Sequence, residues 1–509
     1  MQTISSDQAA RLVNTRDTLA IGGSGGGHTV PESLIEALER RYLDEGAPTG
    51  LRTVHPVGIG DKATKGVHRL RHPGLLERVM CGTVVDAPGI AESAARGEIE
   101  LFTLPQGSLS QHLRELAAGR PGLITEVGLH TFVDPRAEGG SQGRRSDDPP
   151  IELVAMAGRD YIRYKPFPID VAFLRGSTSD EAGNISLEDE AYFGEGLSMA
   201  QAVKRCGGTV VVQVARVVPR GTIDPKTVKI PYFLVDYVVV DRAQPTTYLT
   251  KDSPAYAGRV RLGRDALPGL PPGPRSVIAR RAARELTDGA VCNLGSGIST
   301  GVAVAAAEDG LLERVVLTNE QGLIGGMPMG GLDAGAAVNY DAMVDQPYQF
   351  DLYDGGGLDL AFLSFAEVSA RGDVNISRFG GRIVGVGGFV NISQGASTVV
   401  FSGTFTAGGL ETSWDGHRLS IGQEGRVRRF LDTVEQISFS GTYALDRRQR
   451  VVFVTERAVF ELDGGTLVLT EIAPGIDIER DVLAHMDFMP KIDQPARMDA
   501  RLFEAAYRH

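Results

Sequence analysis

A carboxylate at the end of a buried strand is the first candidate for chemistry in this sequence. The run 313-ERVVLTNE-320 predicts a short buried strand, and the glycine-rich stretch 318-TNEQGLIGGMPMGG-331 carries Glu320 at the point where that strand ends. Glycines let the backbone approach a ligand closely. No histidine, serine, cysteine or metal-ligand cluster stands beside Glu320, so we expect this carboxylate to act without a metal.

Two further stretches could supply polar groups to the same cleft. In 104-LPQG-107, Gln106 follows a predicted strand and precedes a helix, so its side-chain amide could donate a hydrogen bond into a cleft. In 385-GVGGFVNIS-393, the glycines Gly387 and Gly388 could point their amides at a developing oxyanion. Each stretch also has a structural interpretation, because an isolated loop glutamine usually meets solvent and paired glycines before a strand often form only a turn.

Two glycine-rich turns match known motifs only in part. The turn 22-GGSGG-26 fits Gly-x-Ser-x-Gly, but the predicted helix begins at Pro31, seven residues after the serine. A nucleophile elbow needs the helix directly after the serine. This turn and 295-GSGIST-300 both lack the last glycine of a dinucleotide motif. Their backbone amides suit phosphate or other anions, and simple tight turns explain them equally well.

Composition excludes several classes of protein. The 509 residues exceed one ordinary domain, and 42% hydrophobic with 23% charged residues is typical of a globular protein. The formal net charge of −12 argues against nucleic acid as a partner. The cysteines Cys81, Cys206 and Cys292 are far apart and form no CxxC, which argues against a disulfide scaffold or a zinc site and favours a reducing compartment.

The chain also lacks the hydrophobic segments that targeting and membrane insertion require. The start, 1-MQTISSDQAARLV-13, has no basic region followed by an apolar core. No run reaches the roughly 18 apolar residues that span a bilayer. We therefore expect a cytoplasmic protein with no membrane partner.

Buried strands alternate with helical segments along the chain. Runs such as 209-TVVVQVARVV-218, 358-LDLAFL-363 and 398-TVVFSG-403 have the continuous hydrophobicity of strands covered on both faces. The segment 31-PESLIEALERRYLDEG-46 predicts a helix with proline at its start and glycine at its end. The fold class that this alternation predicts is α/β with open sheets.

The two halves of the chain resemble each other. Asp-x-Ala-Phe-Leu followed by Asn-Ile-Ser occurs in 170-DVAFLRGSTSDEAGNIS-186 and again in 359-DLAFLSFAEVSARGDVNIS-377. The proline-rich stretch 263-GRDALPGLPPGPR-275 lies between them and is typical of a stiff linker. We therefore predict two related α/β domains, 1–262 and 276–509, which face each other across a cleft. Chance similarity of two strand-turn segments is the alternative. A polar segment, 135–150, is expected to be an exposed loop.

Eight segments in chain order resemble family I coenzyme A transferases of the single-chain acetate/propionate, short-chain acyl branch. They are 104-LPQG-107, 120-RPGLITEVGLHTFVDPR-136, 217-VVPRGTIDPKTVKIPYFLVDYVVV-240, 293-NLGSGI-298, 319-NEQGLIGGMP-328, 350-FDLYDGGGLDLAFL-363, 385-GVGGFVNIS-393 and 470-TEIAPGIDIERDVLAHMDF-488. The resemblance covers nearly the whole chain, and it implies two open α/β domains of the coenzyme A transferase type.

The resemblance also assigns roles to individual residues. Glu320 occupies the catalytic position of the family's Glu-x-Gly motif, Gln106 that of its Pro-Gln-Gly glutamine, and Gly387 and Gly388 that of its oxyanion loop. The wall that binds coenzyme A is expected to include Gly295, Ser296, Gly297, Ile298, Gly325 and Gly326. This chain departs from its relatives at Ser296 and at Ser299-Thr300, where they usually have Ile and Pro-Glu, so the exact contacts to the coenzyme stay open.

The chemistry implied by the resemblance needs only a carboxylate. Ionised at pH 7, Glu320 would attack an acyl-CoA thioester without a general base. An acyl-glutamyl anhydride and then a glutamyl-CoA thioester would follow, and an incoming carboxylate would reverse the sequence in a ping-pong mechanism. Coenzyme A is then both substrate and covalent intermediate, with no permanently bound cofactor. The expected partners are acyl-CoA and small carboxylic acids, and the expected assembly is a homodimer or homotetramer.

Two other functions fit the same residues. An acyl-CoA hydrolase could use Glu320 through water, because a small change in water access would suffice. A non-catalytic subunit that handles coenzyme A or an acyl carrier is the second alternative. The intact Glu-x-Gly motif and the two-domain length argue against this second alternative.

Overall fold

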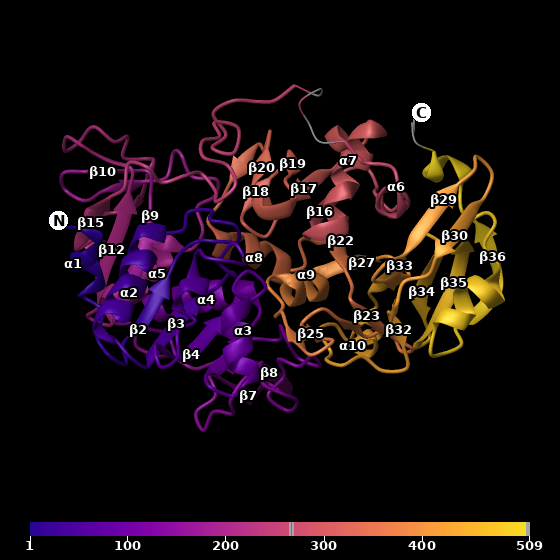
Figure 1. Ribbon diagram of the computed structural model, residues 1–509, viewed down its shortest axis with the longest axis horizontal. Helices are drawn as coiled ribbons and strands as arrows, with labels where there is room; N and C mark the ends of the chain where they lie inside the picture. Colours follow the sequence, from indigo (N-terminus) through magenta and orange to yellow (C-terminus); the bar gives the residue numbers. More distant parts are fainter. Residues whose placement is uncertain (264–265, 267–268, 505–509) are drawn as a thin grey trace.

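The computed structural model describes residues 1–263, 266 and 269–504, and these form two α/β halves around two large sheets (Figure 1). The sheet of the first half has eight strands, and all neighbouring strands are parallel. In spatial order they are β1 (Gln2–Thr3), β15 (Tyr237–Val240), β12 (Thr209–Val214), β9 (Val171–Arg175), β2 (Thr18–Ile21), β3 (Leu51–His55), β4 (Leu76–Cys81) and β5 (Glu100–Thr103).

The sheet of the second half has ten strands and is mixed. In spatial order they are β21 (Ala342–Met343), β18 (Leu323–Ile324), β17 (Val316–Thr318), β16 (Val291–Leu294), β22 (Leu358–Ser364), β27 (Ala396–Ser402), β33 (Arg450–Val454), β34 (Ala458–Asp463), β35 (Thr466–Ile472) and β36 (Lys491–Arg497). The strands from β17 to β33 are parallel. Because the carboxyl ends of parallel strands share one edge, side chains that follow β17 and β16 can meet there.

Helices cover these sheets and fill the junction between the halves. They are α1 (Ser6–Ala10), α2 (Glu32–Glu45), α3 (Pro88–Ala95), α4 (Gln106–Ala117), α5 (Gly196–Arg205), α6 (Pro274–Ala283), α7 (Gly301–Glu308), α8 (Gln346–Asp354), α9 (Phe389–Gly395) and α10 (Gly441–Asp446). As predicted, α2 spans the segment after Pro31 and ends at Gly46, whose φ of 68° is the left-handed conformation that favours glycine. Among the described residues, every helix is too short or too polar to cross a lipid bilayer.

The two halves meet along α4, α8 and α9, which lie side by side near the middle of the molecule (Figure 1). Gln111 on α4 donates to Asp351 and Asp354 of α8, at 3.1 and 2.9 Å. The backbone amide of Gly107 donates to Asn391 of α9 at 3.1 Å. One hydrophobic core runs through both halves at this junction. The start of α4 is therefore held rigidly against the second half.

The repeated Asp-x-Ala-Phe-Leu segments form equivalent strands in the two sheets. The segment that begins at Asp170 forms β9, and the segment that begins at Asp359 forms β22. Each strand is followed by a short antiparallel pair, β10 (Thr178–Asp180) with β11 (Ile185–Ser186), and β23 (Glu367–Ser369) with β24 (Val374–Asn375). The predicted α/β fold with two related halves is confirmed.

Three local predictions need correction or lie partly outside the description. The run 209–218 is not one strand, because it breaks at Ala215 into β12 and β13 (Arg216–Val218), which joins a smaller sheet. The loop 135–150 is largely exposed, but Gln142 is buried and donates to Gln436 of the second half at 2.8 Å. Of the predicted linker 263–275, residues 264, 265, 267 and 268 lie outside the described residues, and α6 already begins at Pro274. The domain boundary stays a prediction.

Candidate active site

A cavity of about 140 Å³ lies between the halves and contains Glu320. The first half contributes Ser24, Val57, Thr83, Asp86 and Gln106 to its walls. The second half contributes Gly295, Ser296, Asn319, Glu320 and Met329. The structure therefore brings together four residues that the sequence suggested for chemistry or for coenzyme A, namely Glu320, Gln106, Gly295 and Ser296.

The turn after β17 projects Glu320 into this cavity. Thr318 is the last residue of β17, and its hydroxyl donates a hydrogen bond of 2.8 Å to the carbonyl of Cys292. The side chain of Asn319 fixes the turn, because it accepts from the amide of Leu323 at 3.1 Å and donates to the carbonyl of Gly335 at 3.0 Å. Gly322, at φ 97°, lets the chain reverse into β18. These bonds hold the turn without using the carboxylate of Glu320, whose contact within the turn is a long hydrogen bond of 3.4 Å from the Gln321 side chain.

Glycine at position 388 is a steric requirement of the Glu320 carboxylate. A Cβ atom at Gly388 would lie 2.1 Å from Glu320 Oε2, so any other residue would displace the carboxylate. Burial raises the pKa of Glu320 to about 7, although hydrogen bonds from the Gln321 side chain and the Gly388 amide oppose this rise. Burial therefore opposes the ionisation that is expected of Glu320 at pH 7.

Gln106 is fully buried, and its side chain has no hydrogen-bond partner. The residue is the first of α4, and its backbone amide donates to the carbonyl of Gly387 at 2.8 Å. Neither Nε2 nor Oε1 bonds to any described residue. A buried amide without a partner is uncommon in folded proteins and demands an explanation. Because Gln106 lines the cavity, its amide is positioned to meet a bound molecule rather than the solvent expected of a loop glutamine.

The two glycines of the predicted oxyanion loop differ in what their amides do. The amide of Gly387 donates to the carbonyl of Gly82 at 2.8 Å, and so does the amide of Val386. Gly387, at φ 51°, therefore shapes the turn with its amide engaged by Gly82, and the oxyanion role expected for it stays a prediction. The amide of Gly388 faces the Glu320 carboxylate instead. The glycines are followed by the helix α9, which the sequence analysis missed.

The residues expected to bind coenzyme A separate into two places. Gly295 and Ser296 line the Glu320 cavity, and Gly297 and Ile298 continue directly into the 3₁₀ turn at Gly297–Thr300 that leads to α7. The pair Gly325 and Gly326 lines a different cavity of about 690 Å³, beside Val304 and Met327. Both glycines have positive φ and pack against the backbone or side chains around Asp341. The structure does not bring this pair to Glu320.

Sequence reasoning missed the wall that the first half contributes after β4. The segment 82-GTVVD-86 crosses to the second half, where Thr83 donates its hydroxyl to the carbonyl of Val384 at 2.6 Å. Asp86 lies at the end of this segment and lines the cavity. Burial raises the pKa of Asp86 to about 6, against the attraction of Lys62. The position directly after a parallel strand was the signal that could have indicated this segment.

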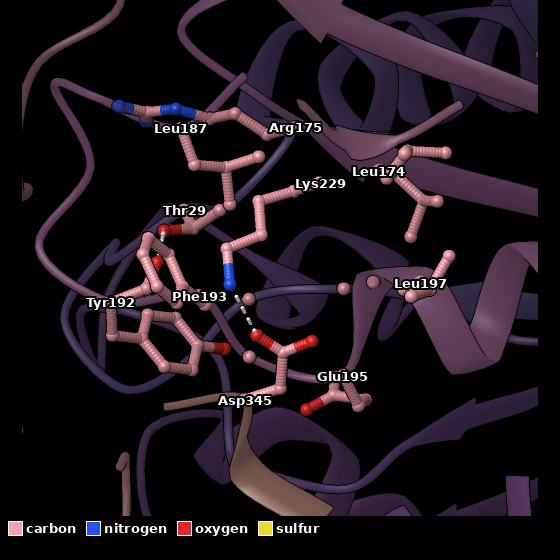
Figure 2. Close-up of a pocket in the computed structure, with 15 residues that line it drawn as sticks. Thr29, Leu174, Arg175, Leu187, Tyr192, Phe193, Glu195, Leu197, Lys229 and Asp345 are labelled. Atoms are coloured by element: carbon pink, nitrogen blue, oxygen red, sulfur yellow. Dashed lines mark hydrogen bonds and ion pairs between the residues drawn. The ribbon is translucent and has the colours of Figure 1, made fainter. Parts of the chain in front are cut away.

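A second, smaller cavity lies behind the glycine turn of the first half (Figure 2). Its volume of about 20 Å³ has room for about one water molecule. Lys229 and Asp345 form an ion pair of 2.8 Å in its wall, whereas no described residue bonds to either carboxylate oxygen of Glu195. Burial raises the pKa of Glu195 to about 8. Gly23 lines this cavity and its neighbour Ser24 lines the Glu320 cavity, so one turn separates the two.

Known proteins match both the sequence and the fold. Residues 3–241 match the family model described as coenzyme A transferase. The chain is 41% identical to acetate CoA-transferase YdiF of Escherichia coli K12, covering 98% of this chain and 94% of the relative. It is also 41% identical to caffeate CoA-transferase of Acetobacterium woodii, covering 98% and 97%.

Solved structures of the acyl-CoA transferase YdiF from Escherichia coli O157:H7 have the same fold. The apoenzyme superposes with a TM-score of 0.95 at 41% identity, covering 99% of this chain and 96% of that one. A thioester complex of that protein with CoA superposes with a TM-score of 0.94 at 40% identity and the same coverage. With identity and fold shared over nearly its whole length, this chain belongs to the coenzyme A transferase family and is a CoA-transferase.

Proposed function

We propose that this enzyme moves coenzyme A from an acyl-CoA to a carboxylic acid, with Glu320 as the nucleophile. The observation that carries the proposal is the position of Glu320 in a cavity between the halves. There the carboxylate faces the amide of Gly388, and the unpartnered amide of Gln106 lines the same cavity. A thioester complex with CoA is known for YdiF, whose fold this chain shares.

The first half-reaction transfers coenzyme A to the enzyme. A carboxylate oxygen of Glu320 attacks the thioester carbonyl carbon, the C–S bond breaks, and an acyl-glutamyl anhydride forms with release of the CoA thiolate. The thiolate then attacks the glutamyl carbonyl carbon of the anhydride. The bond between the glutamyl carbonyl carbon and the bridging oxygen breaks, a glutamyl-CoA thioester forms, and the acyl group leaves with that oxygen as a free carboxylate. No proton is gained or lost in these steps once Glu320 is ionised.

The second half-reaction reverses the first with a new acid. The incoming carboxylate attacks the glutamyl thioester and expels the CoA thiolate, which leaves a second mixed anhydride. The thiolate attacks the acyl carbonyl of that anhydride, so that a new acyl-CoA departs and the Glu320 carboxylate is restored. Every tetrahedral intermediate carries an oxyanion, and a preorganised amide donor beside it stabilises the transition state by roughly 3–4 kcal/mol.

Gln106 and Gly388 supply such donors from opposite halves. The Gln106 amide has no partner among the described residues, so it does not have to break a hydrogen bond to bind an oxyanion. The small volume of the cavity, about 140 Å³, limits water around the anhydride. Exclusion of water prevents hydrolysis of such reactive intermediates. The arrangement favours transfer over the hydrolase alternative, and it gives the non-catalytic alternative no explanation for an unpartnered glutamine beside a carboxylate.

The proposal also covers how the substrates bind, the oligomeric state and the cellular location. Coenzyme A would bind along Gly295 and Ser296, and the acyl group would lie against the first half. Because the cavity has a volume of only about 140 Å³, the acyl chain would be short. Acetate and caffeate name the substrates of two relatives, and both are monocarboxylic acids. We further propose a homodimer or homotetramer. We also propose a cytoplasmic location, which the three widely separated cysteines favour.

Steady-state kinetics with an acyl-CoA donor and a carboxylate acceptor test this function. A ping-pong enzyme gives parallel double-reciprocal lines as the acceptor concentration is varied, and it exchanges label between a free acid and its acyl-CoA without a second acid. Intersecting lines would contradict the covalent mechanism. Loss of thioester at an equal rate with and without an acceptor would indicate the hydrolase, and purified protein with no exchange at all would indicate the non-catalytic alternative.

A further inference from the structure

The acyl side of the cavity contains a carboxylate that the transfer chemistry does not use. Asp86 lines the cavity together with Val57, Thr83 and Val85, all from the first half. None of the contacts among described residues reaches the Asp86 carboxylate as a hydrogen bond or an ion pair. Only the backbone carbonyl of Asp86 is engaged, as the acceptor for the amide of Lys62 at 3.0 Å.

The segment that carries Asp86 is fixed in place. The amide of Val84 donates to the carbonyl of Val384 at 2.8 Å, and the amide of Ala87 returns to the carbonyl of Val84 at 2.9 Å. The helix α3 begins at Pro88, directly after this turn. Because both halves hold the segment, Asp86 cannot move far from the cavity when a substrate enters.

The cavity offers no positive charge that could balance an additional carboxylate. Among the described residues that line it, Asp86 and Glu320 are the charged side chains, and none is lysine, arginine or histidine. Lys62 is the cation that acts on Asp86, but it is exposed and does not line the cavity. Its attraction affects the pKa of Asp86 less than burial does.

We propose that Asp86 makes the enzyme select acids with an uncharged tail and reject dicarboxylic acids. This inference rests on the proposed function, because it places the acyl group against the first half while coenzyme A lies along Gly295 and Ser296. The carboxylate that reacts meets Glu320, and a second carboxylate at the other end of the acid would then meet Asp86 without a counter-charge. Like charges brought together in a partly dehydrated site repel strongly. A hydroxyl on the tail could instead donate to Asp86.

Butyrate and succinate form a matched pair of acceptors for a test, because they have the same chain length and differ in the terminal group. With acetyl-CoA as donor, kcat/KM for butyrate should exceed that for succinate by about 100-fold. In Asp86→Asn this ratio should narrow by at least about 10-fold, mainly through better use of succinate. Glu92→Gln removes one nearby exposed charge from α3 and should leave the ratio unchanged.

Two results would overturn the inference. One is a wild-type enzyme that uses succinate as well as butyrate, and the other is an unchanged ratio in Asp86→Asn or in Asp86→Ser, the second variant in case the first does not fold. Lys62→Met provides a further check, because a loss of succinate use in this variant would assign Lys62 as a receptor for dicarboxylic acids. If neither acceptor takes up coenzyme A with the wild-type enzyme, the proposed function fails instead, whatever the role of Asp86.

Discussion

Two glutamates occupy equivalent places in the same sheet but have opposite surroundings. Glu320 follows β17 and Glu456 follows β33, each two residues after the end of a parallel strand. Glu456 is fully buried and accepts from the amide of Phe405 at 2.9 Å and from Arg457 at 2.6 Å. Among the described residues, the carboxylate of Glu320 has as partners only the Gln321 side chain, at 3.4 Å, and the amide of Gly388. The position after a strand is therefore not sufficient for a catalytic role.

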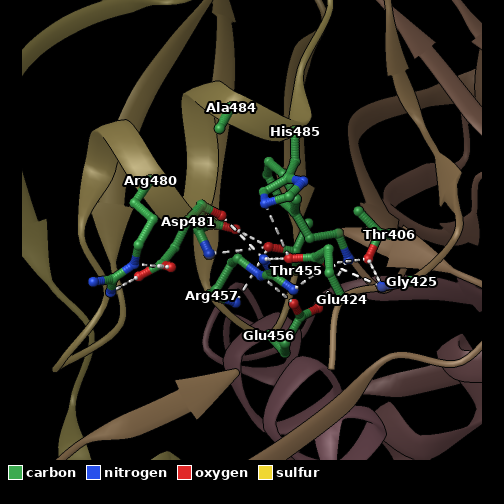
Figure 3. Close-up of polar contacts among 12 residues, drawn as sticks. Thr406, Glu424, Gly425, Thr455, Glu456, Arg457, Arg480, Asp481, Ala484 and His485 are labelled. Atoms are coloured by element: carbon green, nitrogen blue, oxygen red, sulfur yellow. Dashed lines mark hydrogen bonds and ion pairs between the residues drawn. The ribbon is translucent and has the colours of Figure 1, made fainter. Parts of the chain in front are cut away.

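The partners around Glu456 form a closed network (Figure 3). Arg457 is fully buried and donates to Glu456, to Glu424 at 2.7 Å and to the carbonyl of Asp481 at 3.0 Å. Burial alone would raise the pKa of Glu424, but the hydrogen bonds from Arg457 and Thr406 lower it below its usual value. Charged side chains whose hydrogen bonds are all made within the protein stabilise the fold. The side chains of Glu320 and Gln106 keep hydrogen-bonding capacity that a substrate can use.

The largest effect should come from removing the charge of Glu320. Glu320→Gln keeps the size but loses the nucleophile, so transfer should fall by several orders of magnitude while the melting temperature is retained. Glu320→Asp keeps the charge but shortens the side chain by one methylene. Since about 1 Å of misplacement can lower the rate roughly 100-fold, the transfer rate of this variant should also be low. Substantial transfer by Glu320→Gln, in a preparation free of host enzyme, would remove the distinction between the two glutamates.

The opposite result is expected at Arg457. Arg457→Met leaves Glu456 buried without its partner, and breaking a buried pair in this way costs about 3–5 kcal/mol of the free energy of unfolding. Urea denaturation measures this loss, and the specific activity of the folded fraction should persist. Arg480→Met is a matched control, because Arg480 is 71% exposed in its pair with Asp481 and should contribute little. A stable Arg457→Met protein would mean that the network is dispensable.

Gln106→Ala should reduce kcat by about 100-fold or more, which is typical of losing one oxyanion donor. The melting temperature should change little, because the Gln106 side chain has no hydrogen bond to lose within the described part of the chain. Gln111→Ala, one turn further along α4, should behave in the opposite way, since Gln111 donates to Asp351 and Asp354 across the halves. If Gln106→Ala instead lowers the melting temperature while its folded fraction keeps the wild-type kcat, the structural interpretation of Gln106 is correct.

The smallest of these effects is a pH dependence. The deprotonated form of Glu320 is the nucleophile, and burial raises its pKa to about 7. For the free enzyme, kcat/KM should therefore fall about tenfold per pH unit well below 7 and level off above 7. The rate of the first half-reaction is measured as a function of pH by monitoring release of the carboxylate product. The midpoint of this profile gives the pKa of Glu320. A midpoint near the ordinary value of about 4.5 would mean that water reaches Glu320 freely.

The sequence could predict the residues whose role depends on a local motif. Glu320, Gln106, Gly295 and Ser296 all follow strands, and the carboxyl edge of an open sheet brings such residues together. The alternation of strands and helices and the repeated Asp-x-Ala-Phe-Leu segment were enough for two related halves. The helix α2 could also be predicted from the sequence, because the spacing of its apolar residues and its terminal glycine are local signals.

Features that depend on contacts between the halves could not be predicted. The amide of Gly387 is occupied by the carbonyl of Gly82, which is distant in sequence. Asp86 reaches the cavity only because its segment pairs with Val384 and its neighbours. Gly325 and Gly326 lie between β18 and β19 and line a different cavity, so their expected contact with coenzyme A stays a prediction. The raised pKa of Glu320 likewise comes from burial rather than from any neighbour in the chain.

Trapping the covalent intermediate tests the central role of Glu320 most directly. The protein is incubated with an acyl-CoA and no acceptor, reduced with borohydride or captured with hydroxylamine, and digested for peptide mapping by mass spectrometry. The modification should lie within 313-ERVVLTNEQGLIGGMP-328 and on Glu320, and it should be absent from Glu320→Gln. Glu456 provides an internal control, because its saturated carboxylate should stay unmodified. Modification of any other residue, or an equal yield from Glu320→Gln, would contradict the account.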